Sequence, residues 1–309
     1  MTAVVAVVVL CWSAAQGVAQ ATPTRIQLDS GVTPTGHASE QWLTMIRKRL
    51  PRERYDSIAP LRRPLTVEEA AWDSLIRSRV AGWESMVPAL ASLFAPAPPP
   101  AEVFIVVGNR GAEDAFTHDG RTIGYDLAAL QANYGTARKP ENRDRMDRFF
   151  RHEFVHLLQK AWWPEHPWPM DTPLRAALAE IWAEGLGNHY SRSERWLSKG
   201  GRRSPAATAA LADLEPRFVA RLSALACATP EAAEPLLADL SWGRFDRKWG
   251  ALPAALWLEA EPGSTAEALR RFIVAGPAGV WELANRHLPV PLRSVLREAR
   301  TADSLCAPT

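Results

Sequence analysis

The sequence lacks the features by which nucleic-acid-binding proteins hold a phosphate backbone. It has no block of consecutive basic residues, no helix-turn-helix pattern, no RNA-binding motif and no internal repeat. Its 36 Lys and Arg residues are nearly balanced by 34 Asp and Glu residues, which leaves a net charge of only +2. A basic stripe or patch is the usual electrostatic footprint of a nucleic-acid-binding protein. We therefore expect no nucleic-acid partner.

Long apolar runs and cysteines are also scarce. The apolar run at residues 4–12 is too short to span a bilayer comfortably, and the small residues Gly17-Val18-Ala19 follow it. This arrangement is typical of a signal peptide over residues 1–19 and predicts a periplasmic or secreted protein. Membrane association is expected only through that segment, if it stays uncleaved. After cleavage Cys227 and Cys306 are the cysteines that remain, and they can pair in an oxidising compartment.

We expect an α+β, predominantly helical chain. Apolar residues make up 47% of the sequence, which excludes general disorder and is enough for a substantial core with an accessory subdomain. A proline-rich linker and a Lys-Gly-Gly break divide the mature chain into three regions. These are an N-terminal helical region at residues 20–95, a core at 101–198 and a C-terminal helical subdomain at 199–309.

The pentapeptide His152-Glu153-Phe154-Val155-His156 is the feature most informative about function. On an α-helix, residues i and i+4 project from one face, so His152 and His156 can bind the same metal ion. Glu153 then lies close enough to polarise a water molecule on that metal. This is the His-Glu-x-x-His arrangement of zinc-dependent hydrolases.

The neighbouring residues favour a helix over residues 142–160. Asn142 is the candidate N-cap, Asp144 and Asp147 lie near the positive end of the helix, and no Pro or Gly interrupts it. Five apolar residues recur at helical spacing and predict a buried face that leaves the motif pointing elsewhere. They are Met146, Phe150, Phe154, Leu157 and Leu158.

A catalytic zinc site needs a third protein ligand, and the helix expected at residues 179–190 supplies two candidates. Glu180 and Glu184 are also at i,i+4, and either can reach the metal from a helix that returns antiparallel to the first. We favour Glu184 because the glycine that follows it lets the backbone pack close to the metal helix. Glu180 stays open as the alternative.

The segment from Trp182 to Tyr190 resembles the Trp-x-x-Glu-Gly-Phe-Ala segment of aminopeptidase N-type gluzincins, which are zinc metallopeptidases of the peptidase MA-like group. In that clan a zinc-binding Glu follows His-Glu-x-x-His on a second helix, so the resemblance implies that Glu184 is the third ligand. Trp182 stands one residue closer to the Glu than in that pattern, Gly187 replaces Ala, and the spacing between the motifs is longer. The Glu-x-x-x-Asp pattern of thermolysin-like members instead implies Glu180 as ligand and Glu184 as the partner of a histidine.

The resemblance also implies a small sheet before the metal helix, whose edge strand binds extended substrate through backbone hydrogen bonds. Residues 103–108 and 121–125 have the apolar, β-branched character of strands. Gly124-Tyr125 is the candidate edge, and a plain structural hairpin is the alternative. The Gly-x-Met-Glu-Asn motif that holds a free substrate amine in aminopeptidases is absent, so we expect an endopeptidase.

Two further regions carry weaker signals. Gluzincins use a Tyr or His to donate to the oxyanion of the transition state, and no spacing selects among the candidates here. The loop at residues 162–173, with its three Trp and four Pro, either lines the cleft or packs as a satellite cluster, and the 13 Trp of the chain favour packing. The oxyanion candidates are Tyr125, His189, Tyr190 and His287.

The sequence therefore predicts a zinc-dependent metallopeptidase that acts on a peptide or protein substrate. One Zn²⁺ per chain is expected on His152, His156 and Glu184, and Glu153 is expected to move a proton from the attacking water to the leaving amine. The alternatives are a non-catalytic envelope protein that uses the same fold for binding or assembly, and a metal-dependent hydrolase of other substrates. The presence of Glu153 favours an enzyme, because a binding site needs no base.

Overall fold

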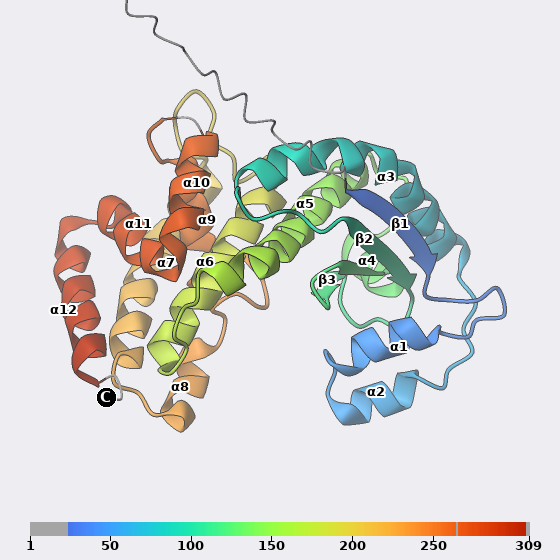
Figure 1. Cartoon of the computed structure of the whole chain (residues 1–309), viewed down its shortest axis with the longest axis horizontal. Helices are drawn as coiled ribbons and strands as arrows, with labels where there is room; N and C mark the ends of the chain where they lie inside the picture. The colour runs from blue at the N-terminus through green and yellow to red at the C-terminus, as the bar shows by residue number, and fades with distance from the viewer. Residues whose placement is uncertain (1–23, 264, 307–309) are drawn as a thin grey trace, which may run out of the picture.

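The computed structural model describes residues 24–263 and 265–306, and it is α+β and predominantly helical, as expected (Figure 1). The predicted signal peptide lies outside the described residues. Four strands form one sheet in the order β1-β2-β4-β3, in which β2 is parallel to both β1 and β4, and β3 is antiparallel to β4. The strands are β1 (Arg25–Ser30), β2 (Glu102–Gly108), β3 (Ala115–His118) and β4 (Thr122–Asp126).

The prediction that Gly124-Tyr125 forms the edge of the sheet is wrong. Strand β4 lies between β2 and β3, and all five of its residues are buried. Gly124 pairs with Phe116 of β3, and a Cβ on Gly124 would lie only 2.8 Å from the Phe116 ring. The edge on this side of the sheet is therefore β3, a four-residue strand that the sequence pattern did not reveal.

The N-terminal region contributes a strand as well as the expected helices. Strand β1 pairs with β2 along its whole length, so this region shares the sheet with the core. Three helices follow β1. The third begins with a complete capping box, in which the side chain of Thr66 accepts from the Glu69 backbone N–H and the side chain of Glu69 accepts from the Thr66 backbone N–H. The Trp83 ring in this third helix stacks on Tyr125 of β4. The helices are α1 (Glu40–Arg47), α2 (Arg52–Ile58) and α3 (Val67–Ser92).

Helix α5 (Pro140–Trp162) carries the His-Glu-x-x-His motif and crosses the molecule between the sheet and the C-terminal helices (Figure 1). The predicted N-cap at Asn142 is wrong, because Pro140 already occupies the first turn and Lys139 precedes it as the N-cap. Asn142 is instead buried within the helix and donates a hydrogen bond to the Thr136 carbonyl at 2.8 Å. The predicted apolar face is confirmed, since all five of its residues are at most 1% exposed. Helix α4 (Leu127–Tyr134) precedes α5, and α6 (Pro173–Ser191) follows it.

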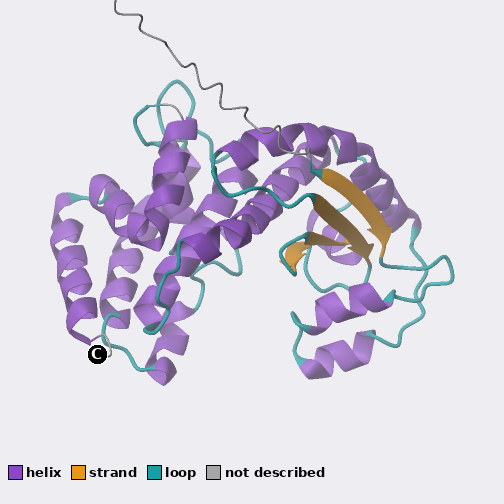
Figure 2. Ribbon diagram, in the orientation of Figure 1, coloured by secondary structure: helices purple, strands orange, loops and turns teal. Residues whose placement is uncertain are grey.

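The C-terminal part is helical, as expected, and packs on the side of α6 that is away from the sheet (Figure 2). Gly200 and Gly201 adopt positive φ angles of 58° and 74° in the turn that precedes it. A disulfide joins Cys227 to Cys306 and so ties the last helix back to the first of this part. Among the described residues, no helix has the length and apolar character needed to cross a membrane. The helices are α7 (Pro205–Leu225), α8 (Pro230–Leu237), α9 (Ala251–Glu259), α10 (Thr265–Ala275), α11 (Gly279–His287) and α12 (Val290–Cys306).

Candidate metal centre

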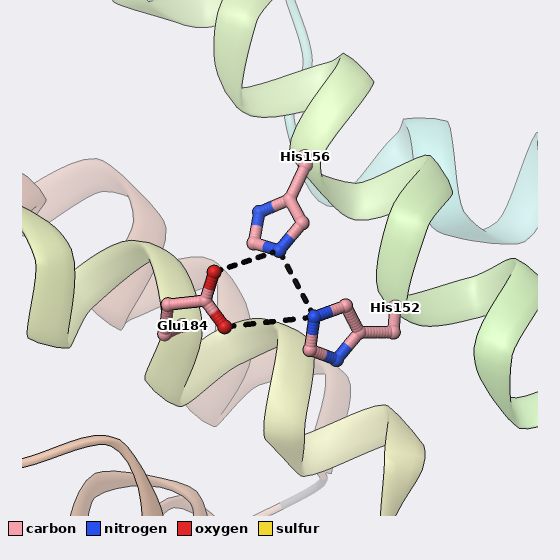
Figure 3. Close-up of side chains that lie close together, drawn as sticks. All are labelled: His152, His156 and Glu184. Atoms are coloured by element: carbon pink, nitrogen blue, oxygen red, sulfur yellow. Dashed lines mark hydrogen bonds and ion pairs between the residues drawn. The ribbon is translucent and has the colours of Figure 1, made fainter. Parts of the chain in front are cut away.

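The structure brings His152, His156 and Glu184 together. Helices α5 and α6 run antiparallel, and the two imidazoles of α5 converge with the carboxylate of α6 (Figure 3). The two Nε2 atoms are 3.0 Å apart, and the Glu184 carboxylate oxygens lie 3.3 Å from His156 Nε2 and 3.6 Å from His152 Nε2. No other group of three or more His, Cys, Asp or Glu in the described part of the chain has metal-binding spacing.

These separations suit a tetrahedral zinc ion. Zinc bonds to nitrogen and oxygen ligands are about 2.0 to 2.1 Å long, so two ligands of a tetrahedral ion are about 3.3 Å apart. The three observed separations, 3.0, 3.3 and 3.6 Å, lie around that value. Three protein donors leave the fourth position of a tetrahedral ion for water or substrate, which is the pattern of catalytic sites. The donor set therefore fits zinc in both type and spacing.

Gln159 orients the ring of His156. Its side-chain nitrogen donates to the Ala183 carbonyl at 3.2 Å, which turns its oxygen toward His156 Nδ1, 2.8 Å away. The proton of the neutral imidazole is then held on Nδ1, and the lone pair of Nε2 faces Glu184 and His152. Gln159 is only 5% exposed. This residue was not predicted from the sequence, although its position three residues after His156 on the same helix is a signal for such a role.

Gly187 makes room for the ring of His152. A Cβ at Gly187 would lie 2.8 Å from His152 Cε1 and 2.9 Å from its Nε2, so the imidazole packs directly on the backbone of α6. Gly185 does not have the role that was predicted for it. Its backbone packs against Ala254 of α9 and not against the metal helix, since a Cβ at Gly185 would lie 2.7 Å from the Ala254 Cβ. The close approach of α5 and α6 thus depends on the glycine three residues after Glu184.

Replacing Gly187 by alanine is expected to weaken zinc binding by about 10 to 100-fold, the range found when the groups that orient metal ligands are altered. The new Cβ must push the His152 ring away, whereas the helix itself gains from alanine. Competition with a chelator of known affinity measures the effect. Gly82→Ala in α3 is the matched control, because its Cβ meets only the end of the Arg79 side chain, at 3.4 Å. Equal zinc affinity in both variants would contradict this role for Gly187.

Glu153 lies beside the cluster in a buried position. Its side chain is 9% exposed, and one carboxylate oxygen is 4.0 Å from His152 Nε2. Burial raises the pKa of Glu153, although the neighbouring imidazoles of His152 and His156 oppose that shift. A carboxylate with a raised pKa accepts a proton more readily near neutral pH, which is what a general base requires.

The charges of the cluster favour a bound cation. Burial lowers the pKa of His156, but the carboxylate of Glu184 more than offsets this and brings it to about 9. Burial raises the pKa of Glu184, but the two imidazoles hold it well below its usual range. Without a metal, the buried carboxylate is therefore balanced by a proton on His156.

Zinc binding is expected to release about one proton per chain at neutral pH, because zinc must displace the proton held on His156. Since the pKa of His156 is about 9, the protonated form dominates below that pH. The apparent affinity should then rise about tenfold per pH unit between about pH 6 and 9, which is the linkage for one proton. Calorimetry in buffers of different ionisation enthalpy measures the released proton. Binding without proton release at neutral pH would contradict the charge state inferred for the cluster.

Glu180, the alternative ligand, lies outside the cluster. Its carboxylate accepts a hydrogen bond from Ser241 Oγ, in the loop between α8 and α9. Burial raises the pKa of Glu180. The structure therefore places Glu184, and not Glu180, beside the two histidines.

The cluster opens into a cavity of about 730 Å³. Helices α5 and α6 form one side, and the loop between α8 and α9 contributes Ser241, Trp242 and Lys248 from another. Strand β3 lines the cavity with the consecutive residues Ala115, Phe116 and Thr117. Successive side chains of a strand point to opposite faces, so three consecutive lining residues mean that the edge of β3, and not one face, borders the cavity. A bound chain in extended conformation can pair with such an edge.

The sequence analysis named two further sets of residues around the motif: the oxyanion candidates and the Trp-rich segment at residues 162–173. None of the four oxyanion candidates lines the cavity. Tyr125 is fully buried under α3, the His189 Nδ1 faces Arg192 at 2.9 Å, and His287 contacts Glu261 at 2.7 Å. Of the three Trp residues at 162–173, Trp163 lines the cavity, and all three pack in or against the core.

Among the cavity residues that were not identified from the sequence are Asn188, Arg49 and Lys248. Asn188, one turn after Glu184, is 1% exposed, and its side-chain nitrogen has no hydrogen-bond partner among the described residues. A bound substrate or an ordered water can satisfy such a donor. Arg49 pairs with Glu113 at 2.6 Å, and its guanidinium lies 5.3 Å from the Trp242 ring centre. Lys248 and Lys160 are the other two cations of the lining. The position of Asn188 is a helical-spacing signal, but nothing in the sequence marks Arg49 or Lys248.

Known proteins do not add to this description. Comparisons of the chain with protein families, with curated proteins and with solved structures give no match.

Proposed function

We propose that this protein is a zinc-dependent metallopeptidase related to the gluzincins, and that it hydrolyses internal peptide bonds. The observation that carries the proposal is the convergence of His152, His156 and Glu184 at zinc-ligand spacing in the wall of a large cavity. Glu153 lies next to this cluster, at the position that a general base requires. A purely structural zinc site would have a closed set of four protein ligands and no use for a buried base.

A zinc ion held by these residues would supply Lewis acidity, which polarises the scissile carbonyl and makes water more acidic. The chain provides the remaining chemistry. Glu153 takes a proton from the attacking water, keeps it while the carbon–oxygen bond forms, and delivers it to the leaving nitrogen. Gln159 and Gly187 keep the two imidazoles in their orientations.

The cavity supports a peptide as the substrate. Its volume of about 730 Å³ lies in the range of about 300 to 1,000 Å³ found for ligand sites. The edge of β3 offers backbone groups to an extended segment, and aromatic rings such as Phe149 and Trp163 line the same cavity. A free amino terminus has no dedicated carboxylate motif in this chain, which favours internal cleavage.

We also propose that the protein acts outside the cytoplasm. The sequence pattern of residues 1–19 is that of an export signal. The disulfide between Cys227 and Cys306 agrees with an oxidising compartment, where disulfides form and persist.

The test of the function combines metal analysis with a cleavage assay on a mixed peptide library. We expect about one zinc per chain. A chelator should abolish cleavage, zinc should restore it, and mass spectrometry should locate the cuts inside the peptides. Absence of stoichiometric metal, even after incubation with zinc, would overturn the proposed centre. A folded, zinc-loaded protein that cleaves none of the peptides would instead favour the non-catalytic binding protein.

A further inference from the structure

Peptide hydrolysis places a negative charge on the oxygen of the scissile carbonyl, and a donor from the protein normally stabilises it. The Tyr and His residues considered for this role lie outside the cavity. Lys248, in contrast, lines the cavity from the loop between α8 and α9. It approaches the centre from an element other than the helices that carry the metal ligands.

The backbone next to Lys248 is held firmly. The Trp249 backbone N–H donates to the Asp239 carbonyl at 2.9 Å, and its indole N–H donates to the Ala238 carbonyl at 2.9 Å. The Gly250 N–H donates to the Leu240 carbonyl at 3.1 Å. Trp249 is 2% exposed and belongs to the main core. Lys248 therefore extends from a rigid base and loses little backbone freedom when it binds a substrate.

The ammonium of Lys248 lies in the same cavity as the His152, His156 and Glu184 cluster. Burial lowers the pKa of Lys248, and the carboxylates of Glu184, Asp114 and Glu153 oppose that shift. Its ammonium lies 5.7 Å from the centre of the Phe245 ring, and no ion pair of Lys248 is found among the described residues. Of the other two cations that line the cavity, Arg49 is already paired with Glu113, and Lys160 is exposed at the end of α5, the helix that carries the histidines. Lys248 is thus near the catalytic carboxylates and available to a new anion.

We propose that Lys248 is a catalytic residue whose Nζ donates a hydrogen bond to the scissile carbonyl oxygen as that oxygen becomes negative. This inference rests on the proposed peptidase function. Water oxygen bonds to the carbonyl carbon, the water proton moves to Glu153, and the π electrons of the carbonyl move to its oxygen beside the ammonium. The carbonyl then re-forms, the carbon–nitrogen bond breaks, and the proton on Glu153 moves to the nitrogen. The products are a carboxylic acid and an amine, and Lys248 stays protonated throughout.

The position of Lys248 favours the oxyanion over a carboxylate of the substrate. A subsite for a terminal carboxylate would lie at one end of the cavity, away from the residues that carry out the chemistry. Lys248 instead lines the same cavity as Glu153 and Glu184, and the charge of both carboxylates acts on it. Preorganised donors of this kind contribute about 10²- to 10³-fold to the rate.

The test compares Lys248→Met and Lys248→Arg with Arg247→Met in the full-length, zinc-loaded protein. Arg247 is the exposed neighbour of Lys248, so its variant removes an equal charge without touching the cavity. For Lys248→Met we expect kcat to fall by about a hundredfold with KM within about twofold. Lys248→Arg should recover at least about a tenth of the wild-type rate, and Arg247→Met should match the wild type. Zinc content should be equal in all of them.

A binding measurement makes the test independent of turnover. A phosphinic peptide carries a tetrahedral, negatively charged group in place of the scissile bond and resembles the transition state. Calorimetry with zinc-loaded protein should show it binding about a hundredfold more weakly to Lys248→Met than to the wild type.

Several outcomes would overturn the role of Lys248. Equal losses in Lys248→Met and Arg247→Met would indicate a general effect of charge. If Lys248→Met raises KM without changing kcat, and only for substrates with a nearby free carboxylate, Lys248 forms a carboxylate subsite. If Lys248→Met binds the phosphinic peptide as tightly as the wild type does, Lys248 does not contact the oxyanion. The proposed function fails separately, when the zinc-loaded wild type neither cleaves peptides nor binds the phosphinic peptide.

Discussion

Glu153→Gln is expected to lower the rate of peptide hydrolysis by about 10²- to 10⁴-fold, the usual scale of general acid–base catalysis. Glutamine keeps the size and hydrogen-bonding capacity of the side chain but cannot accept the proton of the attacking water. Folding and zinc content should barely change, because the three donor groups are untouched. Zinc analysis and peptide-library cleavage, measured together on the same preparations, check both parts of the expectation.

Glu141→Gln is a suitable control for this experiment. It lies in the first turn of the same helix, it is exposed, and it makes the same chemical change away from the cavity. Wild-type activity in Glu141→Gln and loss of activity in Glu153→Gln would locate the effect at the base. Similar cleavage by Glu153→Gln and the wild type would mean that Glu153 is not the base.

Glu184→Ala is expected to abolish stoichiometric zinc binding and, with it, hydrolysis. It removes one of three protein donors and leaves two histidines, and a catalytic zinc site takes three protein ligands. Glu180→Ala removes only the acceptor of the Ser241 hydroxyl and should reduce zinc affinity by about tenfold or less. Elemental analysis after dialysis against a weak chelator distinguishes the two variants.

The comparison of these two glutamates tests the arrangement of the helices as well as the ligand. Zinc loss in Glu180→Ala together with retention in Glu184→Ala would mean that α6 presents its other carboxylate to the histidines. A circular dichroism spectrum of each variant identifies a loss of metal that follows from unfolding.

The motif helix could be predicted because its determinants are local. Two histidines four residues apart share a face of any α-helix, and the apolar residues around Phe154 bury the opposite face. The helix start was misplaced by two residues, because a proline in the first turn outweighs an asparagine as a starting signal. The helical character of the C-terminal part also follows from its local pattern.

The choice between Glu180 and Glu184 depends on contacts that the sequence does not reveal. The two residues are one turn apart, so the rotation and height of α6 relative to α5 decide which of them meets the histidines. That placement is set by long-range contacts, including Gln159 with Ala183, Gly185 with Ala254, and the Trp182 indole with the Phe272 carbonyl at 3.2 Å. A local pattern carries no information about such packing.

The sheet edge was misassigned for a related reason. Gly124-Tyr125 has the character of a strand, and it is one, but whether a strand lies at the edge or inside a sheet depends on its partners. Strand β3 has only four residues and pairs with β4 along its full length, which buries β4 and makes β3 the edge. Tyr125 consequently packs under Trp83 and does not line the cavity.

The sequence by itself determined the chemistry that one helix can present: two imidazoles and a carboxylate at helical spacing, with an apolar face that holds them in place. Tertiary structure decided which glutamate completes the donor set, which strand borders the cavity, and which cations line it. Lys248 lies far along the chain from the motif, and only the packing of the loop between α8 and α9 brings it to the cavity. Side-chain spacing within a helix follows from backbone geometry alone, whereas contacts between distant segments arise from the packing of the whole core.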